Sequence, residues 1–213
     1  MRTIPIMHAT SSSPPARGRN RRGQGERLRG DIIEATLRML DELRDDEALS
    51  LRAVAREVGI AATSVYLHFA DRDALVYAAL EQCTRDLLRD LEAAEAAGGD
   101  AVAGLRARLL FLGSWVREHA GLYKVLHESG LNRRMHLAFK QELAERTTAA
   151  VRRCMDEGRA PAGDAAAVAL DLRAAVHGAV SLRVNEPALP LPPLEEQIDR
   201  FLVKLVGVRL PAA

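Results

Sequence analysis

Apolar positions recur three and four residues apart along most of the chain, which is the spacing of amphipathic helices. Between residues 28 and 43, for example, Ile33, Leu37 and Leu40 fall on one helical face. No stretch shows sustained alternation with period two. Abundant Ala and Leu, with only 4% aromatic residues, also favour helices over strands. The pattern therefore predicts an all-α protein.

Capping residues divide this pattern into elements. Ser50, Asp71, Asp100 and Asp164 each stand just before an apolar-periodic stretch, where a side-chain oxygen caps a helix N-terminus. The expected helices cover about residues 28–43, 51–58, 62–68, 72–94, 101–118, 122–127, 132–156, 165–184 and 194–208. The helix at 165–184 is apolar on nearly all sides, so we expect a thick core or a partner subunit to bury it.

Residues 50–69 predict two short helices joined by a tight turn. The first helix places Leu51 and Val58 on one apolar face, and Gly59 follows where a left-handed residue ends a helix. The second helix, at 62–68, carries several polar side chains. Two short helices with a Gly-containing turn are the arrangement by which a helix-turn-helix motif inserts its second helix into the major groove of DNA.

These residues also carry a family resemblance. The run from Gly59 to Phe69, with its Tyr-x-His-Phe end, followed by Asp71 to Leu75, resembles the N-terminal domain of TetR-family transcriptional regulators. The stretch Ile32 to Leu40 is similar to that family's first helix, and residues 175–182 are a weaker match to its C-terminal domain. The resemblance is clear over about residues 27–90. It implies an N-terminal three-helix helix-turn-helix domain and a C-terminal helical domain for ligand binding and dimerisation.

The chain departs from the family pattern at three places. Ala61 stands where the family has a Ser or Thr cap, which costs about 1 kcal/mol of helix stability. Leu67 occupies a position that is often basic or aromatic. The Gly that commonly follows the first helix is absent, and Arg44 to Glu47 stand there instead.

Charge is distributed unevenly along the chain. The first 30 residues hold seven Arg and one Glu, so they carry +6, and the rest must carry −5 to give the net +1. We expect residues 1–24 to be a disordered basic arm, residues 25–90 the helix-turn-helix domain, and residues 91–213 the effector-binding and dimerisation domain. The arm is either a solvated tail or a DNA contact. Its candidate contacts with phosphates or a minor groove are Arg17, Arg19, Arg21 and Arg22.

A recognition helix presents short polar groups to base edges and longer ones to phosphates. Thr63 and Ser64 suit either contact, and Ala62 suits the methyl group of thymine. Tyr66 and His68 lie near the far end of the helix, where the resemblance implies contacts with the DNA backbone. A partly buried core position is the alternative for Tyr66.

Two arginines complete the predicted DNA-binding set. Arg52 lies in the first turn of the helix at 51–58, and Arg72 lies at the start of the helix at 72–94. Both suit phosphate binding, and the helix dipole at Arg72 favours the same anion.

Aromatic residues and one histidine are candidates for an effector pocket, with core packing as the alternative for each. They are Phe111, Trp115, Tyr123, Phe139 and His177. His177 lies on the apolar helix at 165–184, and the resemblance to ligand-sensing regulators suggests that it faces an effector cavity.

The sequence gives little support to an enzyme, a metal site or a cofactor. It contains no Gly-rich phosphate loop, no G-x-S-x-G and no HExxH. The spacings between the histidines of the C-terminal region match no standard zinc site. These histidines are His119, His127, His136 and His177.

Cysteine and hydropathy patterns point to a cytoplasmic protein. Cys83 and Cys154 have no paired spacing, which fits buried thiols in a reducing compartment. We expect no membrane segment, because no apolar run approaches the ~20 residues that a span needs.

The sequence thus predicts a homodimeric DNA-binding repressor that a small molecule releases from a palindromic operator. The dimer would use the helices at 165–184 and 194–208, with Val180 and Leu205 as candidate interface residues. Two alternatives remain. One is a helix-turn-helix protein that binds DNA constitutively, and the other is a helical enzyme or carrier with a protein-docking hairpin.

Overall fold

The computed structural model of the protein describes residues 24–210, and this range folds into helices without strands. The all-α expectation is confirmed. The first four helices are α1 (Gln24–Leu43), α2 (Leu51–Val58), α3 (Ala62–Tyr66) and α4 (Arg72–Ala96). The others are α5 (Ala101–Glu118), α6 (Ala120–Glu128), α7 (Leu131–Arg134), α8 (Ala138–Asp156), α9 (Ala165–Asn185), α10 (Leu194–Phe201) and a π-helical turn, η1 (Leu202–Val206).

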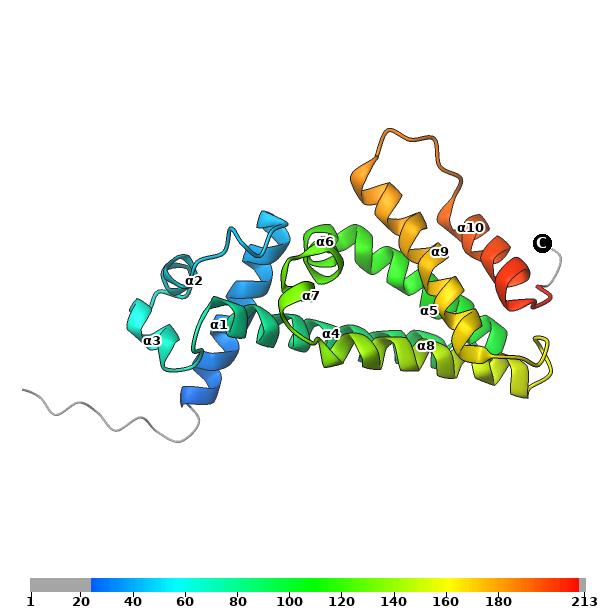
Figure 1. Cartoon of the computed structure of the whole chain (residues 1–213), viewed down its shortest axis with the longest axis horizontal. Coiled ribbons are helices and arrows are strands. Elements are labelled where there is room, and N and C mark those ends of the chain that lie inside the picture. Colours follow the sequence, from blue (N-terminus) through cyan, green and yellow to red (C-terminus); the bar gives the residue numbers. More distant parts are fainter. Residues whose placement is uncertain (1–23, 211–213) are drawn as a thin grey trace, which may run out of the picture.

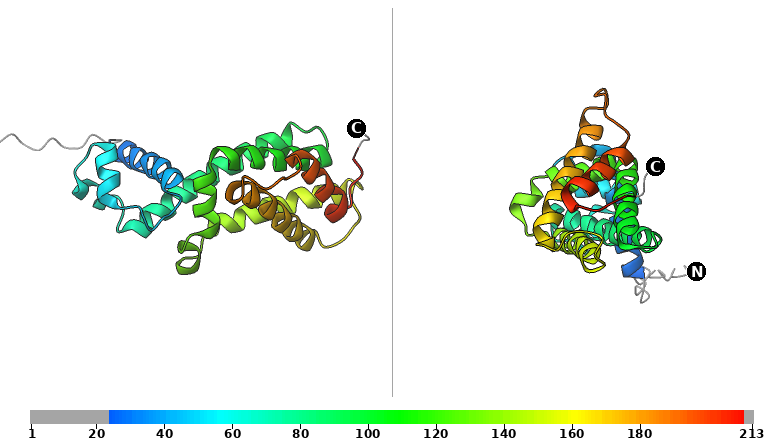
Figure 2. Two further views of the ribbon diagram at one scale, coloured as in Figure 1. Left: turned by 90° about the horizontal axis from the view of Figure 1, so that it is seen from above. Right: turned by 90° about the vertical axis from the view of Figure 1, so that its right-hand side faces the viewer.

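The helices form an elongated molecule. In Figure 1, α2 and α3 lie at one end and α10 at the other, while the long α4 runs from the small N-terminal unit into the larger helical body. Figure 2 shows the same division from above, with a narrow connection between the two parts. Within the larger body, α4 packs on α5 and α8, and α9 packs on α8 and α10.

Two hydrophobic cores fill the molecule. The first joins α1–α4 to α6 and to the segment around α7, and the second joins α5, α8, α9, α10 and η1. Trp115 is half-buried and packs against both cores. The helix-turn-helix unit is therefore packed directly on α6, and α6 in turn belongs to the larger body.

The expected single helix at 132–156 is wrong, because the chain breaks between α7 and α8. Leu131 and Leu137 are both buried in the first core. Six residues apart on one continuous helix, their side chains would point about 120° apart. The extended conformation of Met135 (φ −135°, ψ 146°) turns the chain so that both leucines reach the same core.

The C-terminal helices also differ from expectation. Instead of one regular helix to residue 208, α10 passes into η1 and ends at Gly207, which has φ +79°. Val180 is 2% exposed and belongs to the core of its own subunit, so it is not available to an interface. Leu205 remains 36% exposed.

The expectation that no segment could span a membrane needs a correction. Within residues 24–210, α9 is long and apolar enough to do so by length and composition. It nevertheless packs against α5, α8, α10 and η1. Core helices of soluble proteins pass the same test, and only 33% of the most apolar window of α9 is buried in the subunit.

Candidate DNA-binding surface and effector cavity

The turn between α2 and α3 is fixed by local capping at both ends of α2. The Ser50 hydroxyl accepts a hydrogen bond from the Ala53 amide at 3.2 Å, as the sequence predicted. Gly59 is left-handed, with φ +76°, and the Ile60 amide donates to the Ala55 carbonyl at 2.9 Å. This Schellman-type ending sets the direction in which the chain enters α3.

Helix α3 is held by its buried face. Val65 is fully buried and Phe69 is 4% exposed, with the Arg29 guanidinium 5.1 Å above the Phe69 ring. Ala61 gives α3 no side-chain cap, as expected from the sequence. Ala62 packs against the same core, whereas Thr63 and Tyr66 are exposed on the opposite side of the helix.

The predicted DNA contacts lie on or beside this outward face. Arg52 and Thr63 are exposed, and Tyr66 is 56% exposed, which rules out the core alternative for Tyr66. Leu67 is 84% exposed. Ala62, Ser64 and His68 are half-buried. Helix α3 and the residues around it thus present Thr63, Tyr66 and Leu67 to solvent.

Arg72 is engaged with protein groups rather than open to a phosphate. Its Nη2 atom lies 2.9 Å from Oδ1 of Asp73, and its Nη1 donates to the Glu47 carbonyl at 3.3 Å. A phosphate at this point would compete with the Asp73 carboxylate.

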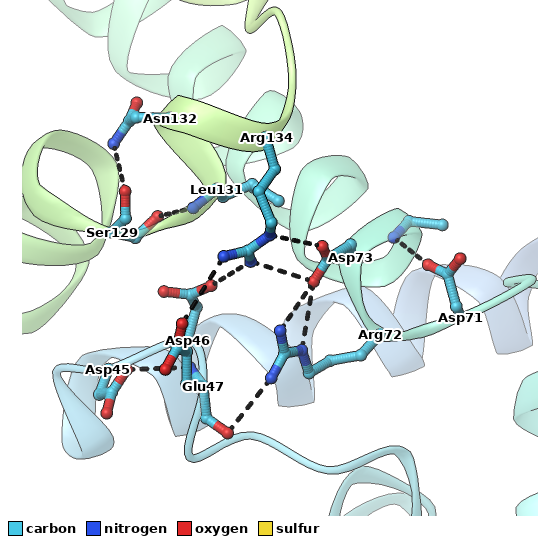
Figure 3. Close-up of polar contacts among 11 residues, drawn as sticks. Asp45, Asp46, Glu47, Asp71, Arg72, Asp73, Ser129, Leu131, Asn132 and Arg134 are labelled. Carbon is cyan, nitrogen blue, oxygen red and sulfur yellow. Dashed lines mark hydrogen bonds and ion pairs between the residues drawn. The ribbon is translucent and has the colours of Figure 1, made fainter.

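Arg134 of α7 connects the larger body to the helix-turn-helix unit, as Figure 3 shows. Its Nε donates to Asp73 at 3.0 Å, at the start of α4, and its Nη2 lies 3.3 Å from Asp46, in the loop between α1 and α2. Glu47 Oε1 lies 3.6 Å from Arg134 Nη1. The hydrogen bond from Arg134 lowers the pKa of Asp73, and Arg72 adds to the effect. No local sequence signal marks a pair 61 residues apart, so this contact could not be predicted.

A second connection joins α1 to the N-terminus of α6. Oδ1 of Asp41 accepts hydrogen bonds from the Gly121 amide at 2.8 Å and from the Leu122 amide at 3.0 Å. His119 Nδ1 lies 3.3 Å from the other carboxylate oxygen. The carboxylate of α1 therefore caps α6, where its charge also suits the helix dipole.

The larger body contains a mostly apolar, partly open cavity of about 250 Å³ among α4, α5, α6, α8 and α9. Its lining residues are Leu87, Leu91, Arg108, Leu109, Leu112, Tyr123, Leu126, His127, Leu143, Thr147, Leu170, Arg173, Ala174, Val176 and His177. Three of them, on α6, thus also belong to the helix that Asp41 caps.

The cavity has one cluster of polar rings. Tyr123 Oη lies 2.5 Å from Nδ1 of His177, and the ring of His127 lies 4.8 Å from that of His177. Burial, and then the positive charge of Lys140, lowers the pKa of His127 to about 3. Burial likewise raises the pKa of Tyr123. Both side chains are therefore neutral near pH 7 and act as hydrogen-bonding groups.

Only part of the predicted pocket set lines this cavity. Tyr123 and His177 do. Phe139 packs instead on Tyr77, with ring centroids 5.5 Å apart, in the first core. Trp115 packs on His119, and Phe111 is half-buried outside the lining. For Phe139 and Trp115 the aromatic character thus reflects packing in the cores of the fold.

Three lining residues, Arg108, Arg173 and His127, were not among the predicted pocket residues. Arg108 gave a usable signal, because it interrupts an apolar stripe of α5 that includes Leu105 and Leu109. A charged residue at such a position is buried only for a reason.

A helix-turn-helix joined to a helical body with a cavity is the architecture of a ligand-binding transcriptional regulator. Residues 32–79 match the family described as bacterial regulatory proteins, tetR family, and residues 105–206 match the tetracyclin repressor-like C-terminal domain. The chain belongs to the TetR family of transcriptional regulators, so DNA binding through the helix-turn-helix follows from membership.

Solved structures with this fold include proteins with bound small molecules. SmeT, the repressor of the Stenotrophomonas maltophilia multidrug efflux pump SmeDEF, is 24% identical over 87% of this chain and 94% of its own, with a TM-score of 0.67. A SmeT–triclosan complex aligns at 23% identity over 88% of this chain and 96% of its own, with a TM-score of 0.68. FadR from Bacillus subtilis, in complex with stearoyl-CoA, is 16% identical over 84% of this chain and 97% of its own, with a TM-score of 0.70.

Proposed function

We propose that the protein is a cytoplasmic, homodimeric repressor that binds a palindromic operator through α3 and leaves it when a small molecule enters the cavity. The observation that carries the DNA-binding part is the geometry of α3. Its one buried residue, Val65, directs Thr63, Tyr66 and Leu67 outward. In this position the hydroxyls of Thr63 and Tyr66 suit contact with base edges and phosphates, whereas Leu67 offers only an apolar contact.

The junction contacts support release by an effector. Helix α6 contributes Tyr123, Leu126 and His127 to the cavity, and its N-terminus is held by Asp41 of α1. The next helix, α7, carries Arg134 against the start of α4 and the α1–α2 loop. A ligand that displaces α6 would therefore shift the helix-turn-helix unit. The two helix-turn-helix units of a dimer must match the spacing of two half-sites, so a small shift of one unit lowers operator affinity.

The exposed apolar surface supports a dimer. On α9 and η1, the side chains of Leu170, Leu182, Val203 and Leu205 are 61%, 37%, 48% and 36% exposed. Packing these helices on their symmetry mates would make a four-helix interface in which the same patch meets itself.

The test is selection from random duplex DNA followed by titration of the selected site. We expect one preferred palindromic sequence, and Tyr66→Ala should weaken its binding about tenfold. Leu189→Ala, a comparably exposed truncation between α9 and α10, is the matched control and should leave affinity unchanged. Absence of any preferred duplex would refute the proposal. The constitutive alternative is supported instead if no compound that fills the cavity changes operator affinity.

A further inference from the structure

Arg108 is a buried cation with an unused hydrogen-bond donor, and it lines both the cavity and a second pocket that contains Glu92 and Glu95. The residue is 2% exposed, and it lies on α5 among apolar neighbours. Its Nη1 lies 3.3 Å from Oε2 of Glu95, but its buried Nη2 has no hydrogen-bond partner among the described residues. An unpaired donor of a charged group is costly when buried, so the position calls for an acceptor.

The charge of Arg108 is partly balanced by two carboxylates: Glu95, with which it forms an ion pair, and Glu92, whose charge raises its pKa. Glu95 is shared with Arg153, which forms a second ion pair with the other carboxylate oxygen. A second cation, Arg173 of α9, also lines the cavity, and the lining contains no Asp or Glu. The cavity therefore has a positive wall beside an otherwise apolar lining.

Neighbouring groups show the same positive field. Burial lowers the pKa of Arg108, the charge of Glu92 opposes this effect, and the charge of Arg146 adds to it. The pKa of Lys140 is lowered by burial and then by the charge of Arg173, and His127 is held neutral by burial and nearby cations. An anion in the cavity would relieve this repulsion, whereas a cation would increase it.

We propose that the cavity takes a small amphipathic carboxylate, whose oxygen accepts from Nη2 of Arg108 while its apolar body lies among the leucines. The apolar contacts would come from Leu87, Leu91 and Leu109 on α4 and α5. The ligand class rests on the proposed function, in that the cavity is taken to be the effector site. A volume of about 250 Å³ suits a short body with a compact head rather than a large headgroup.

The experiment compares three probes with the same ten-carbon chain: decanoate, decanol and decylammonium. Calorimetric titration of the full chain should show decanoate binding at least about tenfold more tightly than decanol, because a charge-assisted hydrogen bond forms only with the acid. Decylammonium should bind most weakly. Equal affinities for decanoate and decanol, or no binding of decanoate at millimolar concentration, overturn the proposal.

Variants locate the effect at Arg108. Arg108→Met should bring decanoate to within about threefold of decanol, and Arg108→Lys should keep most of the preference. Arg152→Met, at an exposed position of α8, removes the same charge outside the cavity and should retain the full preference. A preference that survives Arg108→Met overturns the assignment. If Arg108→Met does not fold, the probe series on Arg108→Lys and on the wild-type protein still tests whether the cavity prefers a carboxylate.

Operator binding gives an independent readout. Decanoate bound in an Arg108-dependent way without any change in operator affinity would leave the ligand class standing and refute effector release. Operator release by an uncharged compound, with no binding of decanoate, would support effector release and refute the carboxylate as the ligand class.

Discussion

Gly121→Ala should disturb the junction between the two parts of the molecule more than its single added carbon suggests. Gly121 is buried at the start of α6, directly against the backbone of α1. A Cβ at this position would lie 1.8 Å from the Asp41 carbonyl oxygen, 2.6 Å from its carbonyl carbon and 2.8 Å from its Cα. These are main-chain atoms, so no side-chain rotation can relieve the clash.

The magnitude follows from that geometry. An ordinary contact begins near 3.4 Å, so the two backbones must separate by about 1.6 Å at this point. Such a separation also stretches the hydrogen bonds from Gly121 and Leu122 to Asp41, now 2.8 and 3.0 Å. Overpacking of a well-packed core costs about 1–3 kcal/mol. For a chain of this length, that loss lowers the Tm by roughly 2–12 °C.

Thermal unfolding followed by circular dichroism measures the loss of stability. Operator titration at 25 °C, with and without effector, measures how the altered contact between α6 and α1 affects DNA binding. We expect a lower Tm and an operator affinity that responds less to effector, because α6 no longer rests on α1. Gly30→Ala is the matched control. Gly30 is exposed on α1, and an added Cβ there meets nothing within 4 Å, so the Tm should rise slightly. A Tm for Gly121→Ala within 1 °C of wild type would refute the reasoning.

Other outcomes follow from single features. Arg44 occupies the left-handed region with φ 56°, so Arg44→Gly should stabilise the fold by about 0.5–1 kcal/mol, measured by chemical denaturation; a loss of stability would contradict this. Leu205→Glu should give a folded monomer in sedimentation, with weak operator binding, if η1 lies at the dimer interface; a wild-type monomer at micromolar concentration would defeat the dimer. Removal of residues 1–22 deletes five Arg, and should weaken operator binding and flatten its salt dependence; unchanged values would mean that the arm, which lies outside the described residues, is a solvated tail.

Features that depend on residues close together in the sequence could be predicted. Ser50, Asp71, Asp100 and Asp164 each accept backbone amide hydrogen bonds at the helix starts where the sequence placed them. Gly59 takes the expected left-handed conformation. Each of these depends on residues within a few positions, so the signal is local.

Features that depend on distant partners were not predictable. Asp41 and Arg134 bind groups that lie 61 to 88 residues away, and nothing in their own neighbourhoods marks them. The break after α7 was missed for a similar reason, because it serves the packing of Leu131 and Leu137 into a core built from other helices. The candidate cavity residues were predicted from residue type alone. Residue type does not distinguish a residue that lines the cavity from one packed in a hydrophobic core.

The position of Trp115 gives the protein a built-in optical probe. It is the chain's single tryptophan, and it packs against both hydrophobic cores with its ring 5.1 Å from that of His119. His119 in turn contacts Asp41, at the point where α6 meets α1. The emission of Trp115 therefore comes from the contact between α6 and α1, and a change in its wavelength or polarisation would record any movement of these helices in unlabelled protein.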